Sequence, residues 1–79
     1  MLTLEMLKEE LNVLYLMSRA LIERRMALIK YLEGCINLTD TMIISTADEL
    51  KENANMIHKL ETDKVVAGLR IELFISKQK

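Results

Sequence analysis

The sequence predicts an all-α protein, either a helical hairpin or a small three-helix bundle, with one long amphipathic helix at its N-terminus. Three observations support this. Apolar residues recur every seven positions through the first half of the chain, and the 79 residues include no proline and only two glycines. Aromatic residues make up only 4% of the chain, which argues against a β-sandwich. Leucine, methionine, isoleucine and alanine fill the apolar positions instead, and they suit contacts between helices.

The first predicted helix covers about residues 3–33. Thr3 is placed to cap its N-terminus, and Gly34 is placed for a left-handed C-terminal cap. A helix that packs against another one carries two apolar rows, each with a seven-residue repeat. The main row consists of Leu7, Leu14, Leu21, Leu28 and Cys35, and the second row of Leu4, Leu11, Ser18, Arg25 and Leu32.

The second row is interrupted by polar residues, and the apolar surface continues beyond both rows. Ser18 and Arg25 stand where leucines would pack best, while Ile22 and Ile29 widen the apolar face on one side and Met17 on the other. A face this broad contacts more than one neighbouring helix. The pattern therefore favours a packed bundle with coiled-coil-like contacts over a two-stranded zipper.

Two further segments follow a loop predicted at about residues 34–40. A second helix is predicted over about 41–60, with its start left open between residues 40 and 46. Its apolar face follows helical spacing through Ile43, Ala47, Leu50, Ala54 and Ile57. A third helix is predicted over about 63–76 with Thr62 as its cap, although residues 69–73 also alternate as a strand would. Residues 1–79 are expected to form one domain.

Charge is distributed in blocks of alternating sign. The formal net charge is −1, but residues 1–18 sum to −2, residues 19–39 to +2, residues 40–63 to −4 and residues 64–79 to +3. Neighbouring antiparallel helices with these charges attract one another. The near-zero net charge argues against nucleic acid as a partner.

The location expected from the sequence is the cytoplasm. The N-terminal residues lack the basic and apolar regions of a secretion signal, and no apolar run approaches the length of a membrane span. Cys35 is the only cysteine, so no disulfide is expected within the chain.

No catalytic group, metal site or cofactor is predicted. His58 is the only histidine and has no nucleophile at helical spacing, and Cys35 is interpreted as a small apolar residue. Asp48, Glu49 and Glu52 suit the acidic start of a helix better than a cation site. Arg25 is the sharpest polar candidate, because an arginine on an apolar seam needs an anionic partner from the chain, another subunit or a ligand.

The predicted function is binding to another protein or to a second copy, since a chain this short has little core of its own. The apolar surface left over by internal packing, including residues 65–75, is expected to meet that partner. The candidate partner-binding residues are Leu7, Leu14, Met17, Leu21, Ile22, Leu28 and Ile29.

In length, in its leucine-rich first helix with the run from Met26 to Lys30, and in its loop near Asp40, the chain resembles the small E-type co-chaperones of type III secretion needle subunits. Members of that group are short cytoplasmic helical hairpins that pair with a second chaperone and keep an aggregation-prone needle protein monomeric. The resemblance covers about residues 4–60. It implies a binding protein without catalytic activity.

A second resemblance concerns residues 7–30, which are similar to the first helix of the all-helical chorismate mutases. It implies that Lys8 and Arg25 bind the carboxylates of an anionic substrate. The chain departs from that family in having lysine at the first of these positions, and in lacking the cationic residues expected near Ile36 and after Asp40. A divergent enzyme acting on an anionic small molecule is therefore the alternative function.

Overall fold

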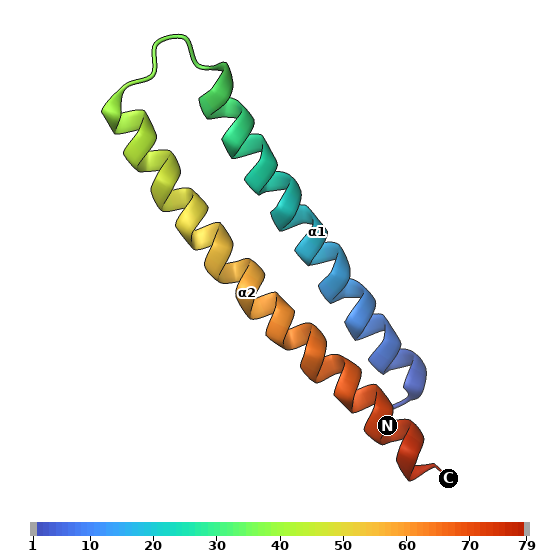
Figure 1. The fold of residues 1–79 in the computed structure, drawn as a ribbon. Helices are drawn as coiled ribbons and strands as arrows, with labels where there is room; N and C mark the ends of the chain where they lie inside the picture. Colours follow the sequence, from blue (N-terminus) through green and yellow to red (C-terminus); the bar gives the residue numbers. More distant parts are fainter. Residues whose placement is uncertain (1, 79) are drawn as a thin grey trace.

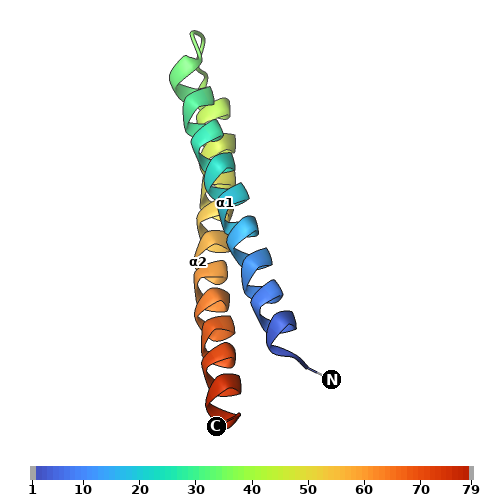
Figure 2. The same cartoon turned by 90° about the vertical axis from the view of Figure 1, so that its right-hand side faces the viewer.

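The computed structural model describes residues 2–78, which form two long antiparallel helices and no strand. Helix α1 spans Leu4–Gly34, and α2 spans Asp40–Lys77. A loop of residues 35–39 joins them at one end, and both termini lie at the other end (Figure 1). The view turned by 90° shows that α1 crosses α2 at a shallow angle and moves to one side toward its N-terminus (Figure 2). The protein is all-α, as predicted, and its principal extents are 62 × 17 × 15 Å.

Threonine caps begin both helices. The hydroxyl oxygen of Thr3 accepts a hydrogen bond from the backbone N–H of Met6, as predicted, and that of Thr39 accepts one from Met42. Thr39 therefore fixes the start of α2 at residue 40, which the sequence had left open. The prediction of a left-handed cap at Gly34 is wrong, because Gly34 is the last helical residue and Cys35 caps α1 with an extended backbone.

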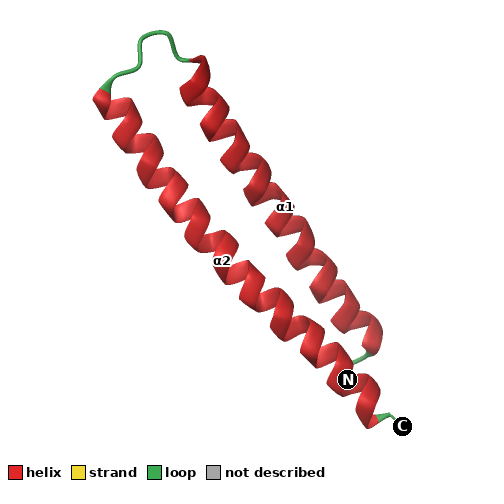
Figure 3. Cartoon of the chain, viewed as in Figure 1, coloured by secondary structure: helices red, strands yellow, loops and turns green. Residues whose placement is uncertain are grey.

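The predicted third helix is not a separate element. Residues 63–76 continue α2 without a break, so the described chain contains two helices in place of three (Figure 3). Thr62 does not cap a new helix, because its hydroxyl group donates to the carbonyl oxygen of His58 within the same helix. The strand alternative for residues 69–73 is also excluded, since these residues are helical.

The seam of α1 follows the two predicted rows. Leu7, Ser18 and Leu28 are buried, and the remaining members of both rows are half-buried. The inclusion of Ser18 and Arg25 in the seam is thus confirmed. The half-buried members are Leu4, Leu11, Leu14, Leu21, Arg25, Leu32 and Cys35.

The seam of α2 differs from the prediction. Leu50 and Ile57 do turn toward α1, but Ile43, Ala47 and Ala54 are exposed. Polar residues occupy inward positions that the apolar pattern had placed outside the seam. The buried residues of α2 are Thr46, Asn53, Leu60 and Ala67, and Ile57, Lys64, Ile71 and Phe74 are half-buried beside them.

The two helices bury little apolar surface. Only four apolar residues among those described are buried, namely Leu7, Leu28, Leu60 and Ala67, and no large side chain is completely enclosed. Twenty large apolar residues remain exposed on the outside of the hairpin. Because so many more apolar residues are exposed than buried, the candidate functional surfaces are the exposed apolar ones.

Candidate functional site: two apolar faces beside a polar seam

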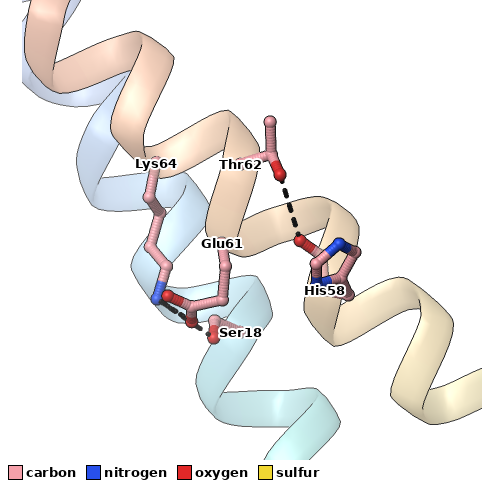
Figure 4. A network of polar contacts seen from close by, with 5 residues as sticks. All are labelled: Ser18, His58, Glu61, Thr62 and Lys64. Atoms are coloured by element: carbon pink, nitrogen blue, oxygen red, sulfur yellow. Dashed lines mark hydrogen bonds and ion pairs between the residues drawn. The ribbon is translucent and has the colours of Figure 1, made fainter.

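A polar cluster crosses the middle of the seam. The ammonium group of Lys64 donates to Glu61 at 2.6 Å and reaches the buried hydroxyl oxygen of Ser18 at 3.5 Å (Figure 4). The same ammonium nitrogen lies 5.0 Å from the ring centre of Tyr15, which is a cation–π distance. Lys64 thus has polar and aromatic partners at a seam position where a leucine would otherwise pack.

Two further polar side chains bond across the seam to backbone carbonyls. The Asn53 side chain, 5% exposed, donates through Nδ2 to the Leu21 carbonyl oxygen at 2.9 Å. The Arg25 guanidinium donates to the Leu50 carbonyl oxygen at 3.4 Å. Arg25 therefore finds its partner in the backbone of α2, and not in the acidic side chains considered from the sequence.

Two ion pairs join the helices on one side of the seam. Arg24 contacts Glu49 at 2.6 Å, and Arg70 contacts Glu10 at 3.1 Å. Each pair links two charge blocks of opposite sign, which confirms the attraction predicted from the charge distribution. All four side chains are about half-exposed, so each pair contributes little stability and serves mainly to favour this alignment.

The side of the hairpin that carries these ion pairs is rich in methionine. We call it the Met face. Several of its large side chains are about half-exposed, and small alanines lie between them. The Met face comprises Met17, Ala20, Ala27 and Tyr31 of α1 with Met42 and Met56 of α2.

The Met face is hollowed along its length. A hollow of about 420 Å³ lies at its centre, where Met17 and Ala20 of α1 meet Met56 of α2. A second hollow of about 490 Å³ lies nearer the loop, between Tyr31 and Met42. Unbranched methionine side chains adjust to different partner surfaces, so this face suits an irregular apolar ligand such as another helix.

The opposite side of the hairpin also presents a row of exposed apolar residues. We call it the Ile face, and it comprises Tyr15, Ile22, Met26 and Ile29 of α1, all exposed. Tyr15 and Ile22 line a hollow of about 560 Å³ together with Ser18, Arg19 and Lys64. At the end of α1, Ile36 follows in the loop and is 96% exposed.

The seven candidate partner-binding residues separate into two groups. The four leucines Leu7, Leu14, Leu21 and Leu28 lie on the seam and face α2, so they form the interior of the hairpin. Met17 lies on the Met face, whereas Ile22 and Ile29 lie on the Ile face.

Residues 65–75, which the sequence also assigned to a partner surface, expose Val65, Val66, Leu69, Leu73 and Ile75. Sequence reasoning missed Met56, Tyr31 and Tyr15, because it did not establish which side of the seam each helix turns outward.

The two candidate anion-binding residues do not come together within one chain. Lys8 is exposed near the start of α1, and Arg25 is half-buried in the seam. Seventeen residues of one helix separate them, which is about 25 Å along the helix axis. Arg25 already bonds to the Leu50 carbonyl.

The remaining candidate groups are scattered over the hairpin. His58 is exposed, and Cys35 is half-buried at the end of α1. Within residues 2–78, no three His, Cys, Asp or Glu side chains gather where they could hold a metal ion. Neither described helix has a stretch apolar and long enough to cross a membrane.

Comparison of the chain with protein-family models, with curated proteins and with solved structures found no match.

Proposed function

We propose that this hairpin is a protein-binding module, and that its Met face holds an amphipathic helix of another polypeptide. The observation that carries the proposal is the imbalance between four buried apolar residues and twenty large exposed ones. Soluble proteins that function as monomers rarely expose large apolar patches, and such patches mark interaction sites.

The Met face favours a helical occupant. It is a long groove between two antiparallel helices, and a third helix in such a groove buries its apolar stripe against both. Its rim carries both signs of charge, including Arg24 and Lys59 beside Glu49 and Asp63. A rim of mixed sign selects a partner by shape and apolar contact more than by net charge.

Within this class, the secretion co-chaperone is the specific form of the proposal. A co-chaperone of this kind shields an aggregation-prone helical subunit until export, which requires an adaptable apolar surface and no catalytic group. An all-helical hairpin with a methionine-rich groove fits that requirement. The working location would be the cytoplasm.

Affinity capture from the cells that naturally produce the chain tests the proposal. The tagged protein should retain a defined helical protein, and Met17→Glu or Met56→Glu should reduce its recovery at least tenfold. Leu69→Glu is the matched control, because it places the same charge at an exposed apolar position on the outer side of α2. Loss of capture with Leu69→Glu but not with Met17→Glu or Met56→Glu would refute the Met face as the binding surface.

The specific form has its own test. The captured protein should be an exported subunit that precipitates when purified alone and stays monomeric when the hairpin is added at equal concentration. Capture of proteins that remain soluble without the hairpin would refute the co-chaperone role while leaving the binding module intact.

A further inference from the structure

We propose that the Ile face is covered by a second copy of this chain, in a two-fold symmetric dimer whose α1 helices run antiparallel and cross at Met26. This inference goes beyond the proposed function, since it concerns the face opposite the one assigned to a partner. It rests on three observations: the surface area of the hairpin, the spacing of the apolar residues, and the spacing of the charges on α1.

The accessible surface area of the hairpin indicates an additional interface. The hairpin exposes 6416 Å², whereas a globular chain of 9.2 kDa exposes about 4,900 Å². The excess of about 1,500 Å² per chain lies within the range of about 1,000–2,500 Å² that each subunit of an obligate homodimer buries. One partner of the same size is therefore sufficient to cover it.

The apolar residues of the Ile face are placed symmetrically about Met26. Ile22 lies four residues before it and Ile29 three residues after it. When a second α1 packs antiparallel with its own Met26 at the crossing point, Ile22 of one copy faces Ile29 of the other, and the two Met26 side chains meet. The loop of the second copy, with the fully exposed Ile36, then reaches the level of Tyr15 and the 560 Å³ hollow beside it.

The charges within and beside this row follow the same symmetry with opposite sign. Arg19 and Glu33 lie seven residues on either side of Met26, so each Arg19 faces Glu33 of the second copy. Glu23 and Lys30 lie three residues before and four residues after Met26, so they also face one another across the interface. Arg19 already contacts Glu23 within its own helix at 3.4 Å, which allows a continuous network of four charges on each side.

The other symmetric arrangement, with both loops at the same end, lacks this complementarity. It places α1 of one copy against α2 of the other at the level set by the contact of Arg25 with Leu50. At that level Met26 lies opposite Glu49 and Glu33 lies opposite Met42, both of which belong to the Met-face side of α2, so Glu33 meets no opposite charge there. The charge pattern of α1 thus selects the antiparallel crossing of α1 on α1.

Single-cysteine crosslinking tests the crossing point. In a Cys35→Ser background, Met26→Cys should form a disulfide-linked dimer rapidly on addition of an oxidant. Met56→Cys is the matched control, because the two methionines are 57% and 54% exposed and Met56 lies on the opposite face. Crosslinking at Met56 and not at Met26 would overturn the proposal.

Charge reversal tests the register without altering the apolar residues. Glu33→Arg places a second guanidinium opposite Arg19 of the other copy and should raise the dimer dissociation constant at least tenfold, measured by sedimentation. Adding Arg19→Glu should restore the dimer, because the pair is then reversed. Circular dichroism should show unchanged helix content, since a basic residue near a helix C-terminus is favourable. A dimer unaffected by Glu33→Arg, failure of Arg19→Glu to restore the dimer, or a monomeric parent protein would each overturn the proposal.

Discussion

Asn53 of α2 donates through its side-chain Nδ2 to the carbonyl oxygen of Leu21 in α1 at 2.9 Å, and this bond lies in the buried middle of the seam. The other end of the same amide, Oδ1, is buried without a hydrogen-bond partner among residues 2–78. A half-satisfied polar group lowers stability, but it also ties one residue of α2 to one residue of α1. Buried asparagines in coiled coils fix register at such a cost.

We therefore predict that Asn53→Leu stabilises the fold. Leucine removes the unpaired oxygen and adds apolar contact, and the Leu21 carbonyl keeps its hydrogen bond within α1. The free energy of unfolding, measured by urea denaturation, should rise by about 1–2 kcal/mol. In the same variant, the two helices should adopt more than one alignment. Hydrogen exchange would detect this as lower protection of the backbone amides near the loop. A lower free energy of unfolding would contradict this description of Asn53.

Leu28 and Leu69 differ in burial, and this difference predicts different effects of the same substitution. Leu28 is 6% exposed in the seam, so Leu28→Ala should lower the free energy of unfolding by about 2–5 kcal/mol. Leu69 is 52% exposed on the outside of α2, so Leu69→Ala should change it by less than about 0.5 kcal/mol. Equal effects of the two substitutions in urea titrations would refute the assignment of the seam.

Replacement by alanine should change the stability of the protein differently at Thr39, which caps α2, and at Thr62, which lies within α2. Thr39 caps the helix by accepting the Met42 N–H, so Thr39→Ala should destabilise the protein by about 1 kcal/mol. Thr62 lies in the helix interior and bonds backward to the His58 carbonyl, so Thr62→Ala should be neutral or slightly stabilising. Thermal unfolding of both variants measures the difference. A larger loss with Thr62→Ala would mean that α2 is interrupted there.

Gly68 lies within α2 and offers a simple test of helix continuity. A Cβ atom placed on it meets no atom within 4 Å beyond its chain neighbours and the local helix backbone. Gly68→Ala should therefore raise the free energy of unfolding by about 0.5–1 kcal/mol, since alanine loses less backbone entropy than glycine in a helix. A loss of stability would indicate that this part of the chain is not helical, or that another chain packs closely against it.

The fold of the first half could be predicted from sequence because its apolar repeat is nearly complete. The leucine rows placed α1 correctly, and the polar members Ser18 and Arg25 were correctly assigned to the seam. The second half was harder, because Thr46, Asn53 and Lys64 occupy its seam while Ala47 and Ala54 lie outside. An apolar pattern alone assigns the alanines to the interior.

The break expected near residue 62 was wrong for a related physical reason. Thr62 is a good cap by type and Gly68 is a poor helix former. However, Lys64 contacts Ser18 of α1, Ala67 is buried and Ile71 is half-buried, and this packing holds the segment in the helix. The division of the exposed residues into a Met face and an Ile face also required the structure. It depends on which residues of α2 lie beside each side of α1, and no spacing within one helix contains that information.

The central claim is that further chains cover the apolar surface that two helices alone leave exposed, and that on the Ile face the covering chain is a second copy. Its most direct test is sedimentation equilibrium combined with thermal unfolding at several protein concentrations. We expect a species of twice the 9.2 kDa chain mass, with a midpoint of unfolding that rises as the concentration is raised. A monomer whose midpoint does not change with concentration would contradict the claim, although the Met face could still bind a different partner.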